Sequence, residues 1–491
     1  MMRYSTVFAL AIASTFVSAC SPGGGGSPFS PATVSTPNPV QSTEAGSAPS
    51  HVAAPVSGSP ISHVIVIIQE NRTLDNLFSS SFLTNGAAYP GANTVSTWTA
   101  PNNTTLPLTE IPFEYPADPD HSHAALLQEA TVVPGAPNYG FYVNPGTGVA
   151  GQPNPPSGFT AAYVPDFETL LYHELAYQYA LADNMFSSRL VPSFPGHMFL
   201  IAGQSDPADD PTDPTNWGCD SAAGSTVGVF SGSTGEAETL PGPFPCFDYV
   251  TLGDLMDKAG VSWRYYTGQV NNTVDAQVDV YDAIKHIRYG ADWNTNIVYP
   301  QTNILNDISA CNLPNVAYVT PPALSSDHAG SLSASGPGWV GSIYLAIVES
   351  QVLQASNPNC QYYGNTAILL TWDDSGGWYD HVTPPIVNGR NWGFRVPLIV
   401  ASTWASHGAP VPFVSHTQRD FGSILAFIEK NWNLGNLGEE DASADPLSDM
   451  FNYKQTPVAP IDTTKLRNQI NATNWPQIKN VKTDRPVDDD K

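Results

Sequence analysis

Uninterrupted apolar segments predict the central strands of this protein. Residues 63–68 read HVIVII, a run without polar alternation that is typical of a strand buried on both faces. Residues 367–372 and 396–401 show a similar pattern, and shorter apolar segments predict strands at 261–266 and 316–319. We therefore expect these strands to form a sheet that is covered on both sides.

Apolar residues at helical spacing predict the elements between these strands. Within 167–182, Leu171, Leu175 and Tyr179 recur every fourth residue and share one helix face. Further helices are predicted at Thr251–Ala259, Trp339–Gln354 and Phe421–Asn431, with a short one at His123–Glu129. This alternation indicates an α/β fold with a mainly parallel central sheet and helices on both of its faces.

Long polar segments interrupt the pattern. Residues 85–165 are rich in Pro, Asn and Gly, and together with 205–247 they predict long loop insertions. The chain becomes polar and Pro-rich from Gly438 onward. We therefore expect one folded domain at 61–455, followed by a polar C-terminal tail at 456–491 that lies on the surface.

The N-terminus predicts export. Residues 1–19 contain an early base and the apolar run FALAIASTFV, which is typical of a signal peptide and too short for a membrane span. The small residues before Cys20 resemble a bacterial lipobox, so Cys20 is predicted to carry a lipid; an ordinary signal peptide is the alternative. Residues 20–60, rich in Ser, Gly, Pro and Thr, predict a flexible tether. The protein would be a membrane-anchored lipoprotein facing the periplasm or cell surface, or would be secreted.

The remaining cysteines fit an oxidising compartment. Cys219, Cys246, Cys311 and Cys360 form an even set, which favours two disulfides and allows three pairings. We favour the sequential pairing, Cys219–Cys246 and Cys311–Cys360. A cysteine metal site is a weak alternative because no CxxC spacing occurs.

The formal net charge of −26 reflects scarce bases more than abundant acids. The chain has 44 Asp+Glu and 18 Lys+Arg, and only 13% of its 491 residues are charged. An average soluble domain has about a quarter. This balance argues against a nucleic-acid binder, which needs a basic stripe, and against a disordered acidic tail.

Polar residues directly follow two of the predicted strands. Glu70 and Asn71 come after the first strand, and Asp373 and Asp374 come after the second. Ligands bind at this edge of open α/β sheets. Adjacent buried carboxylates repel each other unless a cation lies between them. A helix cap at Asn71 and a polar turn at Asp373 are the structural alternatives.

Ser193 lies between two prolines in VPSFP and is a candidate nucleophile, although such a serine can also simply form a turn. With the four residues above it would complete an all-oxygen ligand set, which favours one Ca²⁺ or Mg²⁺ ion over Zn²⁺. A dication would favour the serine alkoxide and offset phosphate charge. His121, His123 and His328 lie beside acids and are candidates for contacting phosphate or protonating a leaving group, or are ordinary surface histidines.

Two long motifs carry a resemblance to a known family. HVIVIIQENRTLDNLF at 63–78 and TWDDSGGWYDHVTPP at 371–385 resemble the signatures of the bacterial phosphoesterase family, and GFRVPLIV and FGSILAFIEKNW look like its C-terminal blocks. That family contains phosphatidylcholine-hydrolysing phospholipases C and acid phosphatase A, within the alkaline-phosphatase-like superfamily. The similarity covers about 61–455, and it implies an alkaline-phosphatase-like α/β fold and hydrolysis of a phosphate ester.

The resemblance also implies roles for individual residues. One divalent ion would be held by Glu70, Asn71, Ser193, Asp373 and Asp374. Ser193 would form a phosphoserine that water then hydrolyses, with His121 and His328 as catalytic histidines and His328 as the leaving-group acid. Substrate contacts are expected from His121, His123, His197 and Arg72. For Arg72, a structural role is the alternative.

Two other functions stay open at this point. One is a non-catalytic surface lipoprotein that uses the same fold for binding, and the other is a related hydrolase such as a sulfatase. The first is disfavoured by the intact set of Glu70, Asn71, Ser193, Asp373 and Asp374, and the second by the absence of the sulfatase modification motif. The expected partners are a phospholipid or a small phosphomonoester and, through the lipid on Cys20, a membrane. The sequence leaves the choice between monoester and diester open.

Overall fold

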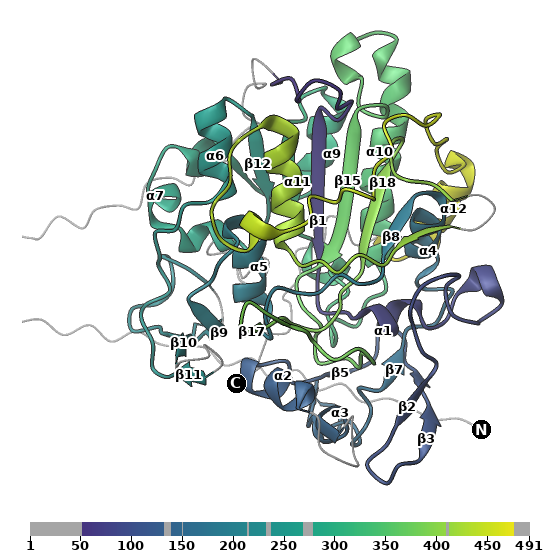
Figure 1. Cartoon of the computed structure of the whole chain (residues 1–491), viewed down its shortest axis with the longest axis vertical. Coiled ribbons are helices and arrows are strands. Elements are labelled where there is room, and N and C mark those ends of the chain that lie inside the picture. Colours follow the sequence, from purple (N-terminus) through teal and green to yellow (C-terminus); the bar gives the residue numbers. More distant parts are fainter. Residues whose placement is uncertain are drawn as a thin grey trace, which may run out of the picture. The chain divides into compact units, whose positions relative to one another are not determined.

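An eight-stranded sheet forms the centre of the computed structural model (Figure 1). From edge to edge its strands are β13 (Ile297–Val298), β12 (Trp263–Tyr266), β14 (Val316–Val319), β1 (His63–Gln69), β15 (Thr366–Trp372), β18 (Leu398–Ser402), β8 (Ala180–Ala182) and β19 (Phe413–Ser415). The structure describes residues 52–131, 139–149, 151–213, 216–231, 237–268, 278–408 and 412–475. The predicted signal peptide, Cys20 and nearly all of the tether lie outside these residues.

The sheet is mainly parallel, as predicted. Strands β13, β12, β14, β1 and β15 run in one direction, and β8 and β19 share it. Strand β18 is antiparallel to both β15 and β8. No helix lies between β15 and β18, so the chain returns without the crossover that a parallel pair requires.

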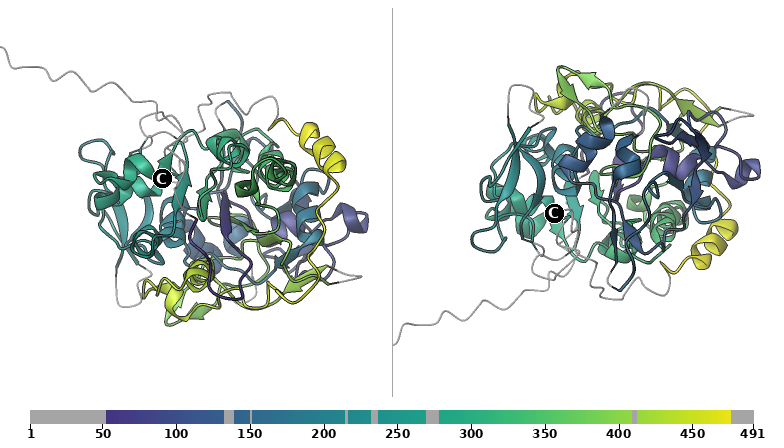
Figure 2. Two further views of the ribbon diagram at one scale, coloured as in Figure 1. Left: turned by 90° about the horizontal axis from the view of Figure 1, so that it is seen from above. Right: turned by 90° about the horizontal axis from the view of Figure 1, so that it is seen from below.

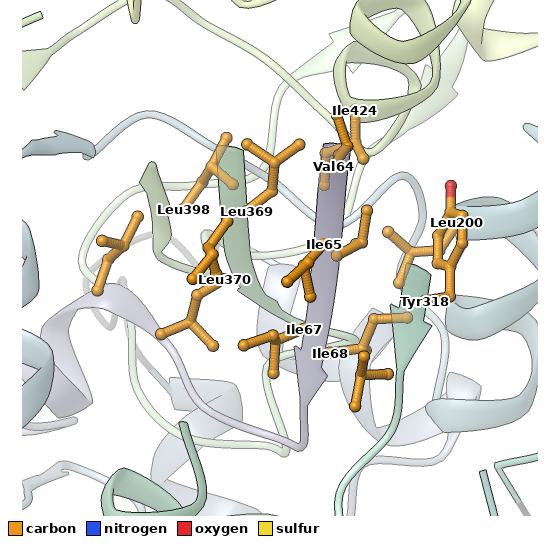
Figure 3. Close-up of a cluster of buried hydrophobic side chains, with 14 of the residues drawn as sticks. Val64, Ile65, Ile67, Ile68, Leu200, Tyr318, Leu369, Leu370, Leu398 and Ile424 are labelled. Atoms are coloured by element: carbon orange, nitrogen blue, oxygen red, sulfur yellow. The ribbon is translucent and has the colours of Figure 1, made fainter. Parts of the chain in front are cut away.

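The apolar run of β1 lies in the middle of the core because parallel neighbours pair with it on both sides. All seven residues of β1 are buried. Figure 3 shows side chains of β1 packed among those of neighbouring strands and helices. The labelled members are Val64, Ile65, Ile67, Ile68, Leu200, Tyr318, Leu369, Leu370, Leu398 and Ile424.

Helices cover both faces of the sheet, as predicted (Figure 2). Helix α10 (Gly336–Gln354) packs with α9 (Asn303–Ser309), α4 (Leu170–Gln178) and α12 (Thr463–Ala472). Helix α11 (Gly422–Trp432) packs with α5 (Ser193–Ala202), which also contacts α6 (Leu252–Ala259). Among the described residues, no helix combines the length and the apolar character that crossing a membrane requires.

The predicted loop insertions contain short regular elements. Segment 85–165 includes β2 (Thr97–Thr99), β3 (Thr105–Pro107), β4 (Thr109–Glu110), β5 (Ala117–Asp118), α2 (His123–Ala130), α3 (Tyr139–Val143), β6 (Thr147–Gly148) and β7 (Ala162–Tyr163). Segment 205–247 includes the small sheet of β9 (Pro207–Pro211), β10 (Val227–Ser231) and β11 (Ala237–Thr239). The other short elements are α1 (Leu74–Phe78), α7 (Lys285–Arg288), α8 (Asp292–Thr295), β16 (Ile386–Val387) and β17 (Arg390–Asn391).

Two boundaries differ from the sequence prediction. The helix expected over 167–182 ends at Gln178, because Ala180–Ala182 pairs with β18 and β19 as strand β8. The segment expected as a polar surface tail contains α12, which buries Leu466 and Ile470 beside α10. Both differences arise from tertiary pairing, which local apolar spacing does not encode.

The four cysteines form two disulfides with the predicted sequential pairing. Cys219 is joined to Cys246, and Cys311 is joined to Cys360, with Cα–Cα distances of 4.5 and 4.8 Å. The first disulfide closes the loop that carries β10 and β11. The second disulfide closes the segment that carries β14 and α10. Each disulfide restrains the chain that it encloses.

Candidate active site

The two predicted acidic motifs meet at the carboxyl edge of the sheet. Strands β1 and β15 are parallel neighbours, with Gln69 opposite Trp372, so the residues that follow each strand lie side by side. The backbone amide of Asn71 donates to Oδ1 of Asp373 at 3.1 Å. Glu70, Asn71, Asp373 and Asp374 are each at most 1% exposed. Asn71 and Asp373 are 302 positions apart in the sequence. The fold therefore brings two distant motifs together at one site.

Ser193 joins this group from helix α5, of which it is the first residue. Its Oγ lies 3.3 Å from Oδ1 of Asn71 and 3.3 Å from Oδ2 of Asp374. Gly196, in the same first turn, permits this approach, because a Cβ there would lie 2.8 Å from the carbonyl oxygen of Asp373. The candidate nucleophile is therefore held at a helix N-terminus, directly against the acidic edge.

Asp373 is held in its ionised form. Its Oδ1 accepts from the backbone amides of Asn71 and Asp374, and its Oδ2 lies 3.4 Å from Nε2 of His197. Burial raises the pKa of Asp373, but interactions with His197, Ser193 and Asn71 outweigh it, so the pKa lies below its ordinary value. His197 comes one turn after Ser193 on α5 and reaches the same carboxylate.

Unusual backbone conformations make this close packing possible. Asn71 has a φ of 63°, in the left-handed region that asparagine tolerates better than most residues. Gly376 has a φ of 57°, and a Cβ there would lie 2.5 Å from the carbonyl oxygen of Asn71. The glycine in the second motif thus lets its loop approach the first motif closely.

Two of the predicted histidines, His121 and His328, lie together, and His121 contacts Asn71. Nε2 of His121 is 2.8 Å from Nδ2 of Asn71, and Nδ1 of His121 is 2.8 Å from the carbonyl oxygen of Pro119. Because a carbonyl only accepts, Nδ1 carries the proton and Nε2 of the neutral ring accepts from the amide. The ring of His328 lies 5.7 Å from that of His121, and both are within 4 Å of Asp118.

Two predicted substrate contacts are buried in other surroundings. Arg72 is 1% exposed, donates to the carbonyl oxygen of Asp327 and to Asn76, and is sandwiched between Phe113 and Trp378. These contacts fit its structural alternative. The ring of His123 bonds to the carbonyl oxygen of Leu190 at 2.6 Å and packs edge-on against Phe230.

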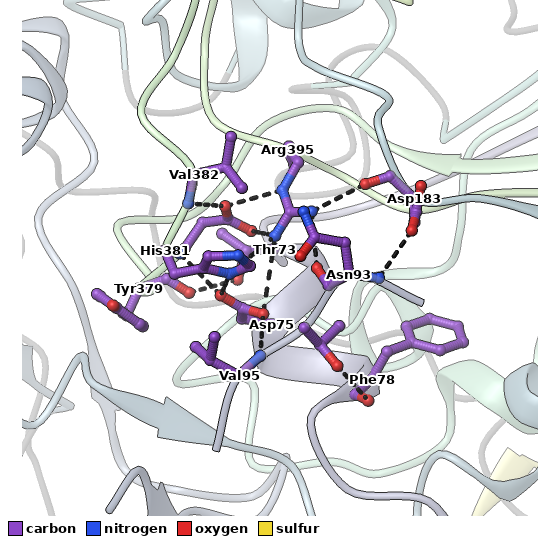
Figure 4. A network of polar contacts seen from close by, with 12 residues as sticks. Thr73, Asp75, Phe78, Asn93, Val95, Asp183, Tyr379, His381, Val382 and Arg395 are labelled. Carbon is purple, nitrogen blue, oxygen red and sulfur yellow. Dashed lines mark hydrogen bonds and ion pairs between the residues drawn. The ribbon is translucent and has the colours of Figure 1, made fainter. Parts of the chain in front are cut away.

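A second acidic cluster lies close by and was not predicted (Figure 4). Among the described residues, the carboxylate and imidazole atoms of Asp75, Asp380 and His381 are near enough to one another for a metal. However, Arg395 forms a bidentate pair with Asp380 at 2.9 and 3.1 Å and lies 3.7 Å from Asp75. A guanidinium therefore already supplies the positive charge in this cluster, and we assign it a structural role.

Sequence reasoning also missed Asp210. This residue belongs to β9, which packs against α5, and its Oδ1 accepts from the backbone amide of Phe194 at 3.0 Å. An acidic residue in the loop region 205–247 carries no local signal that relates it to Ser193. Only the packing of β9 on α5 places the carboxylate next to the candidate nucleophile.

Comparison with known proteins agrees with this site. The sequence matches the Phosphoesterase family over residues 61–435, which include both acidic motifs and Ser193. The chain belongs to the Phosphoesterase family. As a member of this family, it is a phosphoric ester hydrolase, in agreement with the resemblance of its motifs.

Relatives named as phospholipases C extend the match over most of the chain. Phospholipase C A of Mycobacterium tuberculosis is 25% identical, with 84% of this chain and 80% of that protein covered. Non-specific phospholipase C6 of Arabidopsis thaliana is also 25% identical, with 81% of this chain and 74% of that protein covered. A solved structure of an alkaline phosphatase superfamily protein from Vibrio parahaemolyticus is 10% identical and has a TM-score of 0.30. This match covers 63% of this chain and 80% of that chain.

Proposed function

We propose that this phosphoesterase cleaves phosphate esters, either phospholipids or small phosphomonoesters, by nucleophilic attack of Ser193. The observation that carries the proposal is the position of the Ser193 hydroxyl, 3.3 Å from both Asn71 and Asp374 at the N-terminus of α5. An oxygen-rich edge can accept the hydroxyl proton, and helix N-termini favour phosphate charge. The phospholipase C names of the relatives support a phosphodiester as one substrate class.

The donor set of this edge fits one divalent metal ion. Carboxylate, amide and hydroxyl oxygens of Asp374, Asn71 and Ser193 converge within hydrogen-bonding distance. Glu70 and Asp373 are buried next to them. We propose these five residues as ligands, with Ca²⁺ or Mg²⁺ favoured over Zn²⁺ because the ligands are hard oxygens. A bound dication would supply positive charge that a site with several carboxylates needs before it accepts a phosphate.

The reaction would proceed in two steps on Ser193. Oγ attacks phosphorus in line, a phosphoserine forms, and the bond to the leaving oxygen breaks. His328 is proposed to give the leaving oxygen its proton, and Asn71, held by His121, orients Oγ through its amide oxygen. Water then attacks phosphorus, which releases phosphate or a phosphomonoester and restores the serine hydroxyl.

Metal removal tests the ion directly. Exhaustive dialysis against a chelator is expected to lower kcat/KM by on the order of a hundredfold for phosphatidylcholine and for a nitrophenyl phosphate, because the carboxylates would then repel the phosphate. Added Ca²⁺ or Mg²⁺ should restore activity, and a sulfate ester should be hydrolysed poorly throughout. Unchanged turnover by protein shown to contain no metal would contradict the proposed ion.

Export and lipid anchoring complete the proposal. The apolar N-terminal run and the small residues before Cys20 support a lipoprotein that faces the periplasm or the cell surface. The substitution Cys20→Ala is expected to move the protein from the membrane fraction to the soluble fraction, since no acyl chain could be attached. Fractionation with immunodetection checks this result, and a variant that stayed with the membrane would rule out anchoring at this cysteine.

A further inference from the structure

Asp210 holds the backbone amide that directly follows the candidate nucleophile. Its Oδ1 accepts from the amide of Phe194 at 3.0 Å, and the residue is 5% exposed. Helix α5 begins at Ser193, so this amide belongs to the first helical turn and points out of its N-terminus. Figure 1 shows β9, which carries Asp210, next to the end of α5.

A phosphate on Ser193 needs the same end of the helix. Four covalent bonds separate Oγ of Ser193 from the nitrogen of Phe194, so the oxygens of a phosphorus atom attached to Oγ come within reach of that amide. Amides at helix N-termini are preferred partners of phosphate oxygens. The carboxylate of Asp210 and the phosphate group therefore compete for one donor and repel each other.

A second observation also points to a ligand at this place. Nε2 of His197 and Oδ2 of Asp373 are buried beside Ser193 and form an ion pair with each other at 3.4 Å. Among the described residues, neither atom makes a hydrogen bond. Polar atoms buried in this way are usually satisfied by a ligand or an ion when the site is filled.

We propose that Asp210 is a specificity-determining residue that selects substrates by the charge of their phosphate group. This inference rests on the proposed function, since it assumes attack by Ser193. Repulsion from the carboxylate grows with the charge of the phosphate, and a phosphodiester carries one negative charge where a phosphomonoester carries two near neutral pH. Asp210 thus disfavours monoesters relative to diesters at a site that could otherwise accept both.

The substitution Asp210→Asn tests the proposal with little change in shape. The amide oxygen of asparagine can still accept from the Phe194 amide, so the cap of α5 is kept while the charge is lost. The ratio of kcat/KM for nitrophenyl phosphate to kcat/KM for bis(nitrophenyl) phosphate is expected to rise by at least about tenfold. Asp209→Asn is the matched control, because it removes one charge from the neighbouring position of β9 and should leave the ratio unchanged.

Binding of inorganic phosphate provides a readout that does not depend on turnover. At pH 8, where phosphate is a dianion, calorimetry is expected to show at least about tenfold tighter binding by Asp210→Asn than by the wild-type protein. An unchanged ester ratio with unchanged phosphate affinity, or equal changes in Asp209→Asn, would overturn the proposal. If the wild-type protein hydrolysed neither ester, the proposed function would fail, and phosphate affinity would still decide the role of Asp210.

Discussion

Replacement of Ser193 by alanine is expected to lower kcat/KM for phosphate esters at least about a thousandfold, the largest effect on activity that the structure predicts. The substitution removes the hydroxyl oxygen that lies 3.3 Å from Asn71 and Asp374. It leaves the first turn of α5 intact, because alanine is a good helix former. Initial rates on a monoester and a diester, with the far-ultraviolet circular dichroism of each variant, check the result.

Ser423 provides a matched control for this experiment. It is a fully buried serine near the start of α11, and its hydroxyl has no hydrogen-bond partner among the described residues. Ser423→Ala therefore removes the same atoms from a similar helical position away from the acidic edge, and it should retain wild-type activity. Retention of near wild-type turnover by Ser193→Ala would show that another group is the nucleophile.

Replacement of Arg395 by methionine is expected to lower the free energy of unfolding by about 3–5 kcal/mol, the largest effect on stability. Arg395 is fully buried and donates to Asp380 and to the backbone carbonyl oxygens of Asn93 and Asp183 (Figure 4). Its loss leaves the carboxylates of Asp380 and Asp75 buried without their guanidinium partner. Burial raises the pKa of Asp380 even though Arg395 opposes this effect, so these charges already depend on their partner.

Urea denaturation measures this effect, and Arg390→Met is its control. The Arg390 side chain is 57% exposed and lies 3.6 Å from Glu440, and exposed pairs of this kind contribute less than about 1 kcal/mol. A loss below about 1 kcal/mol in Arg395→Met would show that water or rearrangement compensates for the buried charges. A second substitution, Asp380→Asn, should recover part of the loss because it removes one of the stranded carboxylates.

The main strands and the paired motifs were predictable because their signals are local. The apolar run of β1 has no polar alternation, so both of its faces had to be buried, and the same reasoning located β14 and β15. Both polar pairs follow predicted strands, at the edge of the sheet where ligands bind, so Glu70, Asn71, Asp373 and Asp374 were expected to share one site. Asn71 and Gly376, which adopt left-handed conformations, are also residue types that tolerate them.

Contacts between distant segments were not predictable in the same way. Arg72 and the Asp380–His381 pair belong to the same motifs as the proposed metal ligands. However, Arg72 packs against aromatic rings, Asp380 pairs with Arg395, and His381 pairs with Asp75. A motif records which residues are close in sequence, whereas the direction of each side chain depends on its packing. The strand β8 and the helix α12 likewise exist because partners elsewhere in the chain cover them.

By itself, the sequence determined the class of fold, the edge of the sheet at which the acidic motifs meet, and the family. Hydrophobic periodicity and contiguous motifs carry that information because each is a property of neighbouring residues. Tertiary structure alone decided that Ser193 begins a helix aimed at Asn71 and Asp374, that Arg395 neutralises the second acidic cluster, and that Asp210 holds the Phe194 amide. These pairings depend on how β9, α5 and the loop after β15 pack, and packing is a property of the whole folded chain.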